Sequence, residues 1–329
     1  MTEASRFTDS SNVTFPGKFR SQSYYDDRHS GFPDVGLSPT YRSIRPDHPN
    51  IMSAKSMTAA RNAVPNRYGW IADLPDHRDF VYGAPPAVAA ALPPKVDLRQ
   101  TKYLPVAYNQ GRIGSCTANA IAGALQFTRR KEGHSPDFTP ARLFIYWNER
   151  NVEHTVPLDN GAQIRDGIKV VNKIGVVPES EWTYDDAPAN PTTHLWPAGA
   201  KPTLRPPPAV FTDAKKFQAI GYQRVPRALS QFKGVLASGY PFVFGFSVYA
   251  SFESAVVAQT GKLNLPTPTE ACLGGHAVLA VGYDDPAQRF IVRNSWGPGW
   301  GQAGYFTMPY AYLLDENLSD DFWTIRVVE

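Results

Sequence analysis

The sequence contains very little cysteine, with only Cys116 and Cys272 among 329 residues. Two cysteines cannot build a disulfide framework, so a packed core must hold the chain together. No window approaches 18 consecutive apolar residues, which argues against a membrane-spanning helix. The opening residues, MTEASRFTDSSNVTF, lack the apolar run of a secretory signal. We therefore expect a cytoplasmic protein, or one exported without a cleavable signal peptide, and no membrane partner.

An excess of charge of either sign is also missing. The 33 basic and 30 acidic residues leave a formal net charge of +3, and no dense Lys/Arg run occurs. A nucleic-acid partner is therefore not indicated. The hydrophobic content of 42% and charged content of 19% fit an ordinary globular protein. What the chain does have is 30 prolines and 25 glycines, which indicate many turns and long connections.

Composition divides the chain into three parts, 1–66, 67–91 and 92–329. The first is rich in Ser and Pro, and its aromatic residues follow no helical or strand period. Three interpretations stay open for it: a flexible tail, a pro-segment that covers a cleft, and an export region. In 67–91, aromatic and acidic residues alternate with turn residues before an Ala/Pro-rich stretch, which indicates a surface-packed segment and a linker. Residues 92–329 hold the main domain.

The first half of the main domain has mostly helical sequence patterns, and the second half has mostly strand patterns. A helix is predicted to begin at Cys116, with small or apolar residues four apart, Ser115 as N-cap and basic residues in its last turn. The second half carries β-branched and aromatic runs separated by Gly, Asp and Pro. Further helices are predicted at 139–151, 164–173 and 228–237, and strands at 241–248, 277–283, 290–294, 305–308 and 323–328. This segregation predicts an α+β protein with a helical lobe and a sheet lobe.

Cys116 occupies a position with chemical consequences. The unpaired N–H groups and the dipole at a helix N-terminus favour a thiolate, which lowers the pKa of the thiol. A thiolate is a nucleophile, so this placement suits covalent catalysis if a base lies nearby. The alternative is that Cys116 is a small buried hydrophobic residue, the usual state of a lone cysteine.

Among the seven histidines, His276 stands apart. It follows two glycines and opens the apolar run AVLAVGY, whereas the other six lie in polar or turn-rich contexts. Asn294 ends the next predicted strand, 18 positions later (294 − 276). If the two strands form a hairpin, the Asn294 amide can orient the imidazole and aim its other nitrogen at the sulfur. A structural histidine and an ordinary glycine-rich turn are the alternatives for this pair.

In combination these segments resemble the papain-like cysteine proteases, with the general form of the bacterial members. The matching stretches, in family order, are LPPKVDLR (92–99), NQGRIGSCTANA (109–120), DNGA (159–162), GGHAVLAVGY (274–283) and NSWGPGWG (294–301). The resemblance implies a two-lobed papain-like fold, a helical lobe plus an antiparallel β-sheet or barrel lobe, with the active-site cleft between them. It also implies hydrolysis of peptide bonds through a thioester acyl-enzyme, without metal or other cofactor, by a chain that we expect to be a monomer.

The same resemblance assigns roles to individual residues. Cys116 would be the nucleophile, His276 the general base and then acid, and Asn294 the residue that orients His276. The Gln110 side chain and the Cys116 backbone N–H would form the oxyanion hole, and Trp296 would shield the His276–Asn294 hydrogen bond. Small residues that would line the substrate subsites, and leave room for a bulky apolar side chain two positions before the scissile bond, are Gly161, Ala162, Gly245 and Ala277.

Two positions depart from the family signature. A cysteine is expected three residues before the nucleophile and an aromatic residue after it, but the chain has Ile113 and Thr117. The missing cysteine removes a disulfide that many secreted members have. A regulatory disulfide between Cys116 and Cys272 is a minor alternative to a free Cys272 thiol. Because a pro-segment normally precedes the mature start, we expect residues before about 92 to cover the cleft and to make the chain a zymogen.

Other functions are compatible with the same motifs. A papain-fold acyltransferase or transglutaminase-like enzyme would use the same groups but pass the acyl group to an amine. A non-catalytic descendant that only binds peptides is the other alternative. Its expected mark is the loss of a catalytic residue, yet Cys116, His276, Asn294 and Gln110 are all present.

Overall fold

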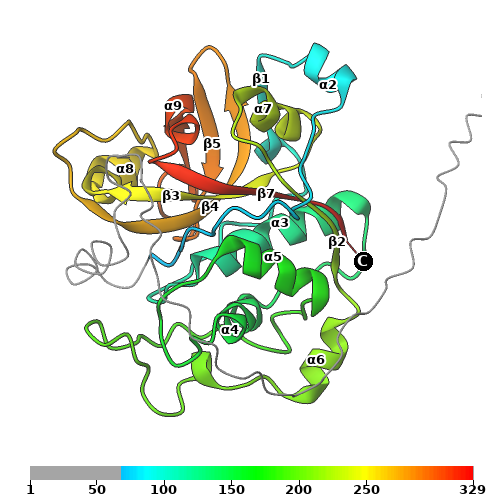
Figure 1. Ribbon diagram of the computed structural model, residues 1–329, viewed down its shortest axis with the longest axis vertical. Coiled ribbons are helices and arrows are strands. Elements are labelled where there is room, and N and C mark those ends of the chain that lie inside the picture. The colour runs from blue at the N-terminus through cyan, green and yellow to red at the C-terminus, as the bar shows by residue number, and fades with distance from the viewer. Residues whose placement is uncertain (1–67, 329) are drawn as a thin grey trace, which may run out of the picture. The chain divides into compact units, whose positions relative to one another are not determined.

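The computed structural model describes residues 68–328 (Figure 1). The predicted extension 1–66 therefore lies outside the described residues. The helices are α2 (Pro86–Ala90), α3 (Cys116–Glu132), α4 (Arg142–Val152), α5 (Ile164–Lys173), α6 (Pro208–Ala214), α7 (Leu229–Ala237), α8 (Ala255–Thr260) and α9 (Tyr310–Leu314). Short 3₁₀ turns occupy Leu98–Gln100, Lys201–Thr203 and Ala250–Glu253. No helix within 68–328 is long and apolar enough to cross a membrane.

The strands form one antiparallel sheet in the second half of the chain. They are β1 (Lys95–Asp97), β2 (Ala219–Arg224), β3 (Phe242–Tyr249), β4 (Cys272–Asp284), β5 (Arg289–Arg293), β6 (Tyr305–Pro309) and β7 (Ser319–Val328). Their order is β2-β7-β3-β4-β5-β6, with β1 beside β4. The sheet is open, with β2 and β6 at the ends of this path, so the barrel alternative is not realised among the described strands. The short β1 and β2 were not predicted, because neither is a long apolar run.

The helical lobe is built around α3, which packs on β4 and β7 as well as on α4 and α5. Its first fourteen residues are buried. Several of them are alanine or glycine, which are small enough to let neighbouring elements approach the helix closely. Ser115 occupies the N-cap position, but its side chain makes no capping hydrogen bond. Its hydroxyl lies 2.6 Å from the Tyr184 hydroxyl instead. The helix ends at Glu132 and is capped by Gly133, whose φ of 78° is the left-handed conformation that favours glycine.

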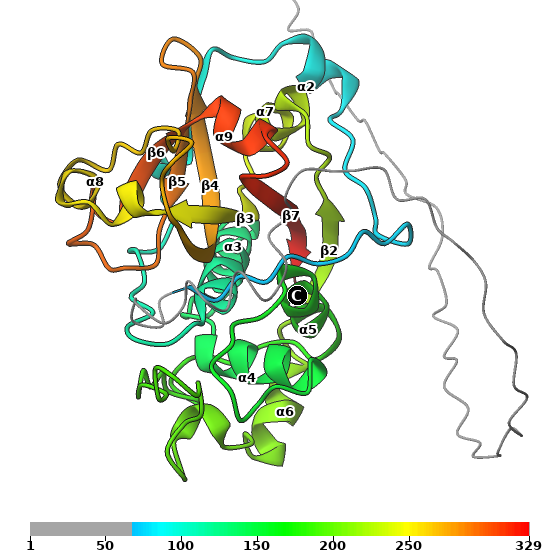
Figure 2. The ribbon, with the colours of Figure 1, turned by 60° about the vertical axis from the view of Figure 1, so that its left-hand side comes forward.

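A strap, which we define as residues 68–82, runs between the sheet and α5 in both views of the molecule (Figures 1 and 2). It touches both lobes through its backbone. The Trp70 N–H donates to the Gly275 carbonyl on β4 (2.9 Å), and the Ile71 N–H donates to the Ala162 carbonyl before α5 (3.0 Å). Three aromatic side chains of the strap, Tyr68, Trp70 and Tyr82, are buried. The strap therefore passes through the junction of the lobes.

Candidate active site

Cys116 is the first residue of α3, where the sequence predicted it. Its side chain is fully buried, and its sulfur accepts a hydrogen bond from the Ala277 N–H at 3.3 Å. Burial raises the pKa of the thiol to about 12, although hydrogen bonds from the backbone of Ala277 and Gly69 act in the opposite direction. The prediction of a lowered pKa is therefore wrong for this state of the molecule. Excluding water from the sulfur outweighs the favourable helix end.

His276 and Asn294 meet across the sheet as the hairpin argument predicted. His276 lies in β4, Asn294 directly follows β5, and the two strands pair antiparallel. The Nε2 of His276 is 2.8 Å from Asn294 Oδ1, which also accepts from the Ser295 N–H at 2.8 Å. Because a carbonyl oxygen only accepts, Nε2 must carry the proton and Nδ1 the lone pair. Among residues 68–328, Nδ1 is buried and has no hydrogen-bond partner.

Aromatic rings enclose this imidazole. The ring centroids of Trp296, Phe246 and Tyr68 lie 5.3, 5.8 and 5.9 Å from that of His276. His276 is fully buried, and this burial lowers its pKa to about 4, although the hydrogen bond that it donates to Asn294 acts to raise the pKa. The thiol and the imidazole are therefore both neutral near pH 7 in this state.

Gln110 is held rigidly beside the same loop. Its amide Nε2 donates to the Ile113 carbonyl (3.0 Å), and its Oε1 accepts from the Ser295 hydroxyl (2.6 Å). The Gln110 N–H also donates to the Ser295 carbonyl at 2.8 Å. Since both ends of the amide are engaged, its orientation is set by the turn that leads to Cys116 and by the residue after Asn294.

The two departures from the family signature are both accommodated in the core. Ile113 is fully buried and belongs to the hydrophobic core. The hydroxyl of Thr117 donates to Oε2 of Glu149 at 2.9 Å. Glu149 is itself fully buried, and this burial raises its pKa well above the ordinary value. Cys272 is half-buried, and both cysteines are free thiols, so this structure holds no disulfide between Cys116 and Cys272.

The four predicted subsite residues all lie against the strap or the sulfur. Ala162 donates its N–H to the Gly69 carbonyl (2.7 Å). A Cβ built on Gly161 would overlap the backbone of Gly69, and one built on Gly245 would overlap the indole of Trp70. Ala277 contacts the sulfur through its N–H. The structure thus places these four residues together, against the strap or against the Cys116 sulfur.

Two residues of the cleft were missed. Gly275 binds the Trp70 N–H through its carbonyl, and the double glycine before His276 was its only local signal. Asp321, in β7, accepts the Trp70 indole N–H at 2.9 Å. It stands in a polar Ser-Asp-Asp run at the start of β7. Nothing in that run marks it as part of a site.

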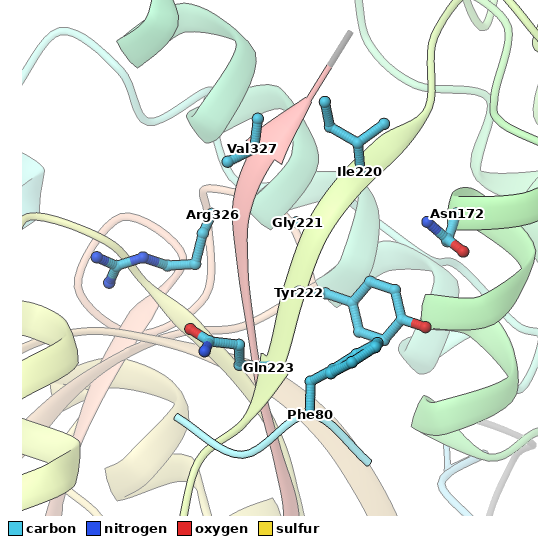
Figure 3. A pocket seen from close by; sticks show the side chains of 8 residues that line it. All are labelled: Phe80, Asn172, Ile220, Gly221, Tyr222, Gln223, Arg326 and Val327. Atoms are coloured by element: carbon cyan, nitrogen blue, oxygen red, sulfur yellow. The ribbon is translucent and has the colours of Figure 1, made fainter. Parts of the chain in front are cut away.

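A shallow hollow of about 440 Å³ lies elsewhere, on β2 and β7 (Figure 3). The rings of Phe80 and Tyr222 meet edge to face there, with centroids 6.2 Å apart. Its lining consists of Phe80, Asn172, Ile220, Gly221, Tyr222, Gln223, Arg326 and Val327. None of these residues is among the predicted site residues.

A family model described as papain family cysteine protease matches residues 92–312 of the chain. The chain belongs to the papain family of cysteine proteases. As a papain-family protease it is similar to xylellain, a cysteine protease from Xylella fastidiosa, at 49% identity and a TM-score of 0.76. That match covers 80% of this chain and 97% of xylellain.

Two further relatives of this papain-family protease are informative. An uncharacterized peptidase C1-like protein of Acanthamoeba polyphaga mimivirus is 40% identical over 289 residues, which cover 81% of this chain and 89% of the viral protein. Digestive procathepsin L 3 of Tenebrio molitor shares the fold at a TM-score of 0.59 with 17% identity, over 84% of this chain and 80% of the other. The α+β architecture with a helical lobe and a sheet lobe is thus the family's fold.

Proposed function

We propose that this chain is a cysteine endopeptidase in which Cys116 is the nucleophile, His276 the base and then acid, and Asn294 the residue that fixes the imidazole tautomer. The observation that carries the proposal is the His276 Nε2–Asn294 Oδ1 hydrogen bond of 2.8 Å. Because this bond commits the Nε2 proton to Asn294, the Nδ1 lone pair is left to take the thiol proton.

The reaction follows from these roles. His276 Nδ1 accepts the proton of Cys116, and the sulfur attacks the carbonyl carbon of the scissile peptide bond. The Gln110 amide and the Cys116 N–H stabilise the negative oxygen that develops. The carbon–nitrogen bond then breaks, the imidazolium gives its proton to the leaving amine, and an acyl thioester remains on Cys116. Water hydrolyses the thioester with His276 again acting as base, which restores the free thiol.

The strap supports the endopeptidase assignment and an inhibitory role for the N-terminal segment. Gly69, whose backbone lies against Cys116 and Ala162, is an interior residue of the sequence, so the groove admits the interior of a chain rather than only its end. The Gly69 carbonyl accepts the Ala162 N–H at 2.7 Å, and the Gly69 backbone also hydrogen-bonds the Cys116 sulfur, so the strap occupies the place beside the nucleophile that a substrate needs. With the thiol kept neutral under the strap, this state is a latent zymogen.

The proposal is tested by labelling the full chain with an epoxide inhibitor of cysteine proteases and measuring intact mass. We expect one adduct on Cys116, lost in Cys116→Ala and strongly slowed in His276→Ala. Cys272→Ala is the matched control, since it removes the other cysteine of the sequence. It should label at the wild-type rate. Labelling of Cys116 no faster than that of Cys272, even when the strap is displaced, would refute the proposed chemistry.

A further inference from the structure

The hydroxyl group of Tyr184 lies between the two segments that carry the donors of the proposed oxyanion hole. It donates a hydrogen bond to the Gln110 backbone carbonyl at 2.8 Å, and it lies 2.6 Å from the Ser115 hydroxyl. Gln110 supplies one donor through its side-chain amide. The peptide bond that follows Ser115 supplies the other, which is the Cys116 N–H. Tyr184 itself belongs to no helix or strand and stands in the connection between α5 and α6. One side chain of a distant connection thus links both halves of the oxyanion hole.

The hydrogen bonds around Tyr184 can run in one direction only. Arg142 carries donors alone, so its Nη1 donates to Oδ1 of Asn119 at 3.1 Å. The amide nitrogen of Asn119 then donates to the Ser115 hydroxyl oxygen at 3.0 Å. Because Tyr184 donates its own proton to Gln110, the Ser115 hydroxyl must donate to Tyr184. Hydrogen bonds therefore lead in series from a guanidinium group to the Gln110 carbonyl.

Arg142 holds the same loop at a second point. Its guanidinium lies 4.0 Å from the centre of the Tyr184 ring and donates to both carboxylate oxygens of Glu179 at 2.7 Å. Its Nη1 also donates to the Asn109 carbonyl at 3.0 Å. Two consecutive carbonyls, those of Asn109 and Gln110, are thus held by Arg142 and Tyr184. Because hydrogen bonds in series polarise one another, a cation at the start of the series strengthens the bond at its end.

We infer that Tyr184 is a positioning residue for the oxyanion hole, whose hydroxyl group sets the separation between the Gln110 side chain and the Cys116 N–H. The inference rests on the proposed peptidase function and deepens it by naming the residue that fixes the geometry of the two donors. Burial raises the pKa of the Tyr184 hydroxyl, so this group keeps its proton at neutral pH and can donate. Both donors must point at the place where the negative oxygen develops, so a small shift of one of them slows the reaction without weakening substrate binding.

The test is the Tyr184→Phe variant of the full chain, assayed on one fluorogenic peptide. The variant keeps the ring that packs on Arg142 and removes only the hydroxyl. We expect kcat to fall by roughly 10- to 100-fold, with KM changed by less than about 2-fold. Formation and hydrolysis of the acyl thioester both pass through a negatively charged oxygen, so kcat reports the oxyanion hole whichever step limits the rate. Competition from the strap acts on KM.

Alkylation of Cys116 by iodoacetamide separates positioning from a folding defect. The sulfur displaces iodide from a saturated carbon, so no negative oxygen develops and the oxyanion hole is not needed. Tyr184→Phe should therefore be alkylated at the wild-type rate, within about 2-fold. The matched control is Tyr283→Phe, because the Tyr283 hydroxyl also donates to a backbone carbonyl, that of Pro93 at 2.6 Å, and not to Gln110. This control should keep the wild-type kcat.

Two more variants show through which groups the hydroxyl acts. Ser115→Ala removes the second partner of the Tyr184 hydroxyl and should lower kcat in the same direction as Tyr184→Phe. In a Gln110→Ala background, Tyr184→Phe should lower kcat by about 2-fold or less, because the donor that it positions is already absent.

Four results would each overturn the inference alone. They are a wild-type kcat in Tyr184→Phe or Ser115→Ala, a change confined to KM, alkylation slowed as much as kcat, and an undiminished effect of Tyr184→Phe in the Gln110→Ala background. Absence of both peptide turnover and Cys116 labelling in the wild type would instead overturn the proposed function, and the inference with it.

Discussion

Replacing Asp73 by Asn should release the strap and expose Cys116. The Asp73 side chain is fully buried, and its Oδ1 lies 2.8 Å from Arg224 Nη1 and 3.0 Å from Arg165 Nη2. Removing one member of a buried ion pair costs about 3–5 kcal/mol when the partner charge is stranded. Here both arginines keep other carboxylates, Asp79 and Asp321, so we expect about 2 kcal/mol. That corresponds to roughly a 30-fold larger open fraction.

The assay is the rate at which a small alkylating reagent modifies Cys116 in the full chain at pH 7, followed by intact mass in Cys272→Ala background. With a thiol pKa of about 12, the covered form holds only about 10⁻⁵ of its thiol as thiolate, so labelling reports strap opening. The matched control is Asp76→Asn, which removes the same charge from the strap. Among residues 68–328, the ion-pair partner of Asp76 is Arg78, which belongs to the strap itself and lies at 2.7 Å. Equal rates for the two variants would refute the ion-pair latch.

Three further predictions follow from the same geometry. Burial lowers the pKa of His276 from 6.5 to about 4. Between these two pH values the folded state therefore binds fewer protons than the unfolded state. The free energy of unfolding, measured by chemical denaturation, should therefore fall by about 3 kcal/mol as the pH drops from 6.5 to 4. The His276→Gln variant should lose less stability over this range. The control variant His77→Gln, at an exposed position, should lose as much as the wild type. Gln110→Ala should lower kcat by about 100-fold or more with little change in KM, measured on one fluorogenic peptide; a change confined to KM would contradict an oxyanion role. Gly245→Ala should have opposite effects in two assays, because its Cβ overlaps Trp70: faster alkylation of Cys116 and slower cleavage of peptides with large aromatic residues. Faster cleavage of those peptides relative to small ones would contradict the assignment of Gly245 to a substrate subsite.

Much of the fold could be predicted because its signals are local. The helix that begins at Cys116, the helix at 164–173 and the strands around His276 and Asn294 each show in the spacing of apolar residues and in flanking glycines. The short elements β2 and α6 lack such a period and were not predicted. Ser115 was placed correctly at the helix start. Its hydroxyl nevertheless bonds Tyr184, 69 residues away, which no local rule foresees.

The sequence by itself therefore determined the family and the α+β class. It also singled out Gln110, Cys116, His276 and Asn294 as the candidate site, because these residues stand in short motifs at the ends of helices and strands. Only the tertiary structure decided the charge state of the site and what occupies the cleft. The raised pKa of Cys116 comes from burial, part of which the strap supplies. The hydrogen bond from Trp70 to Asp321 joins residues 251 positions apart. Neither segment carries a pattern that names the other, so their meeting is a property of packing alone.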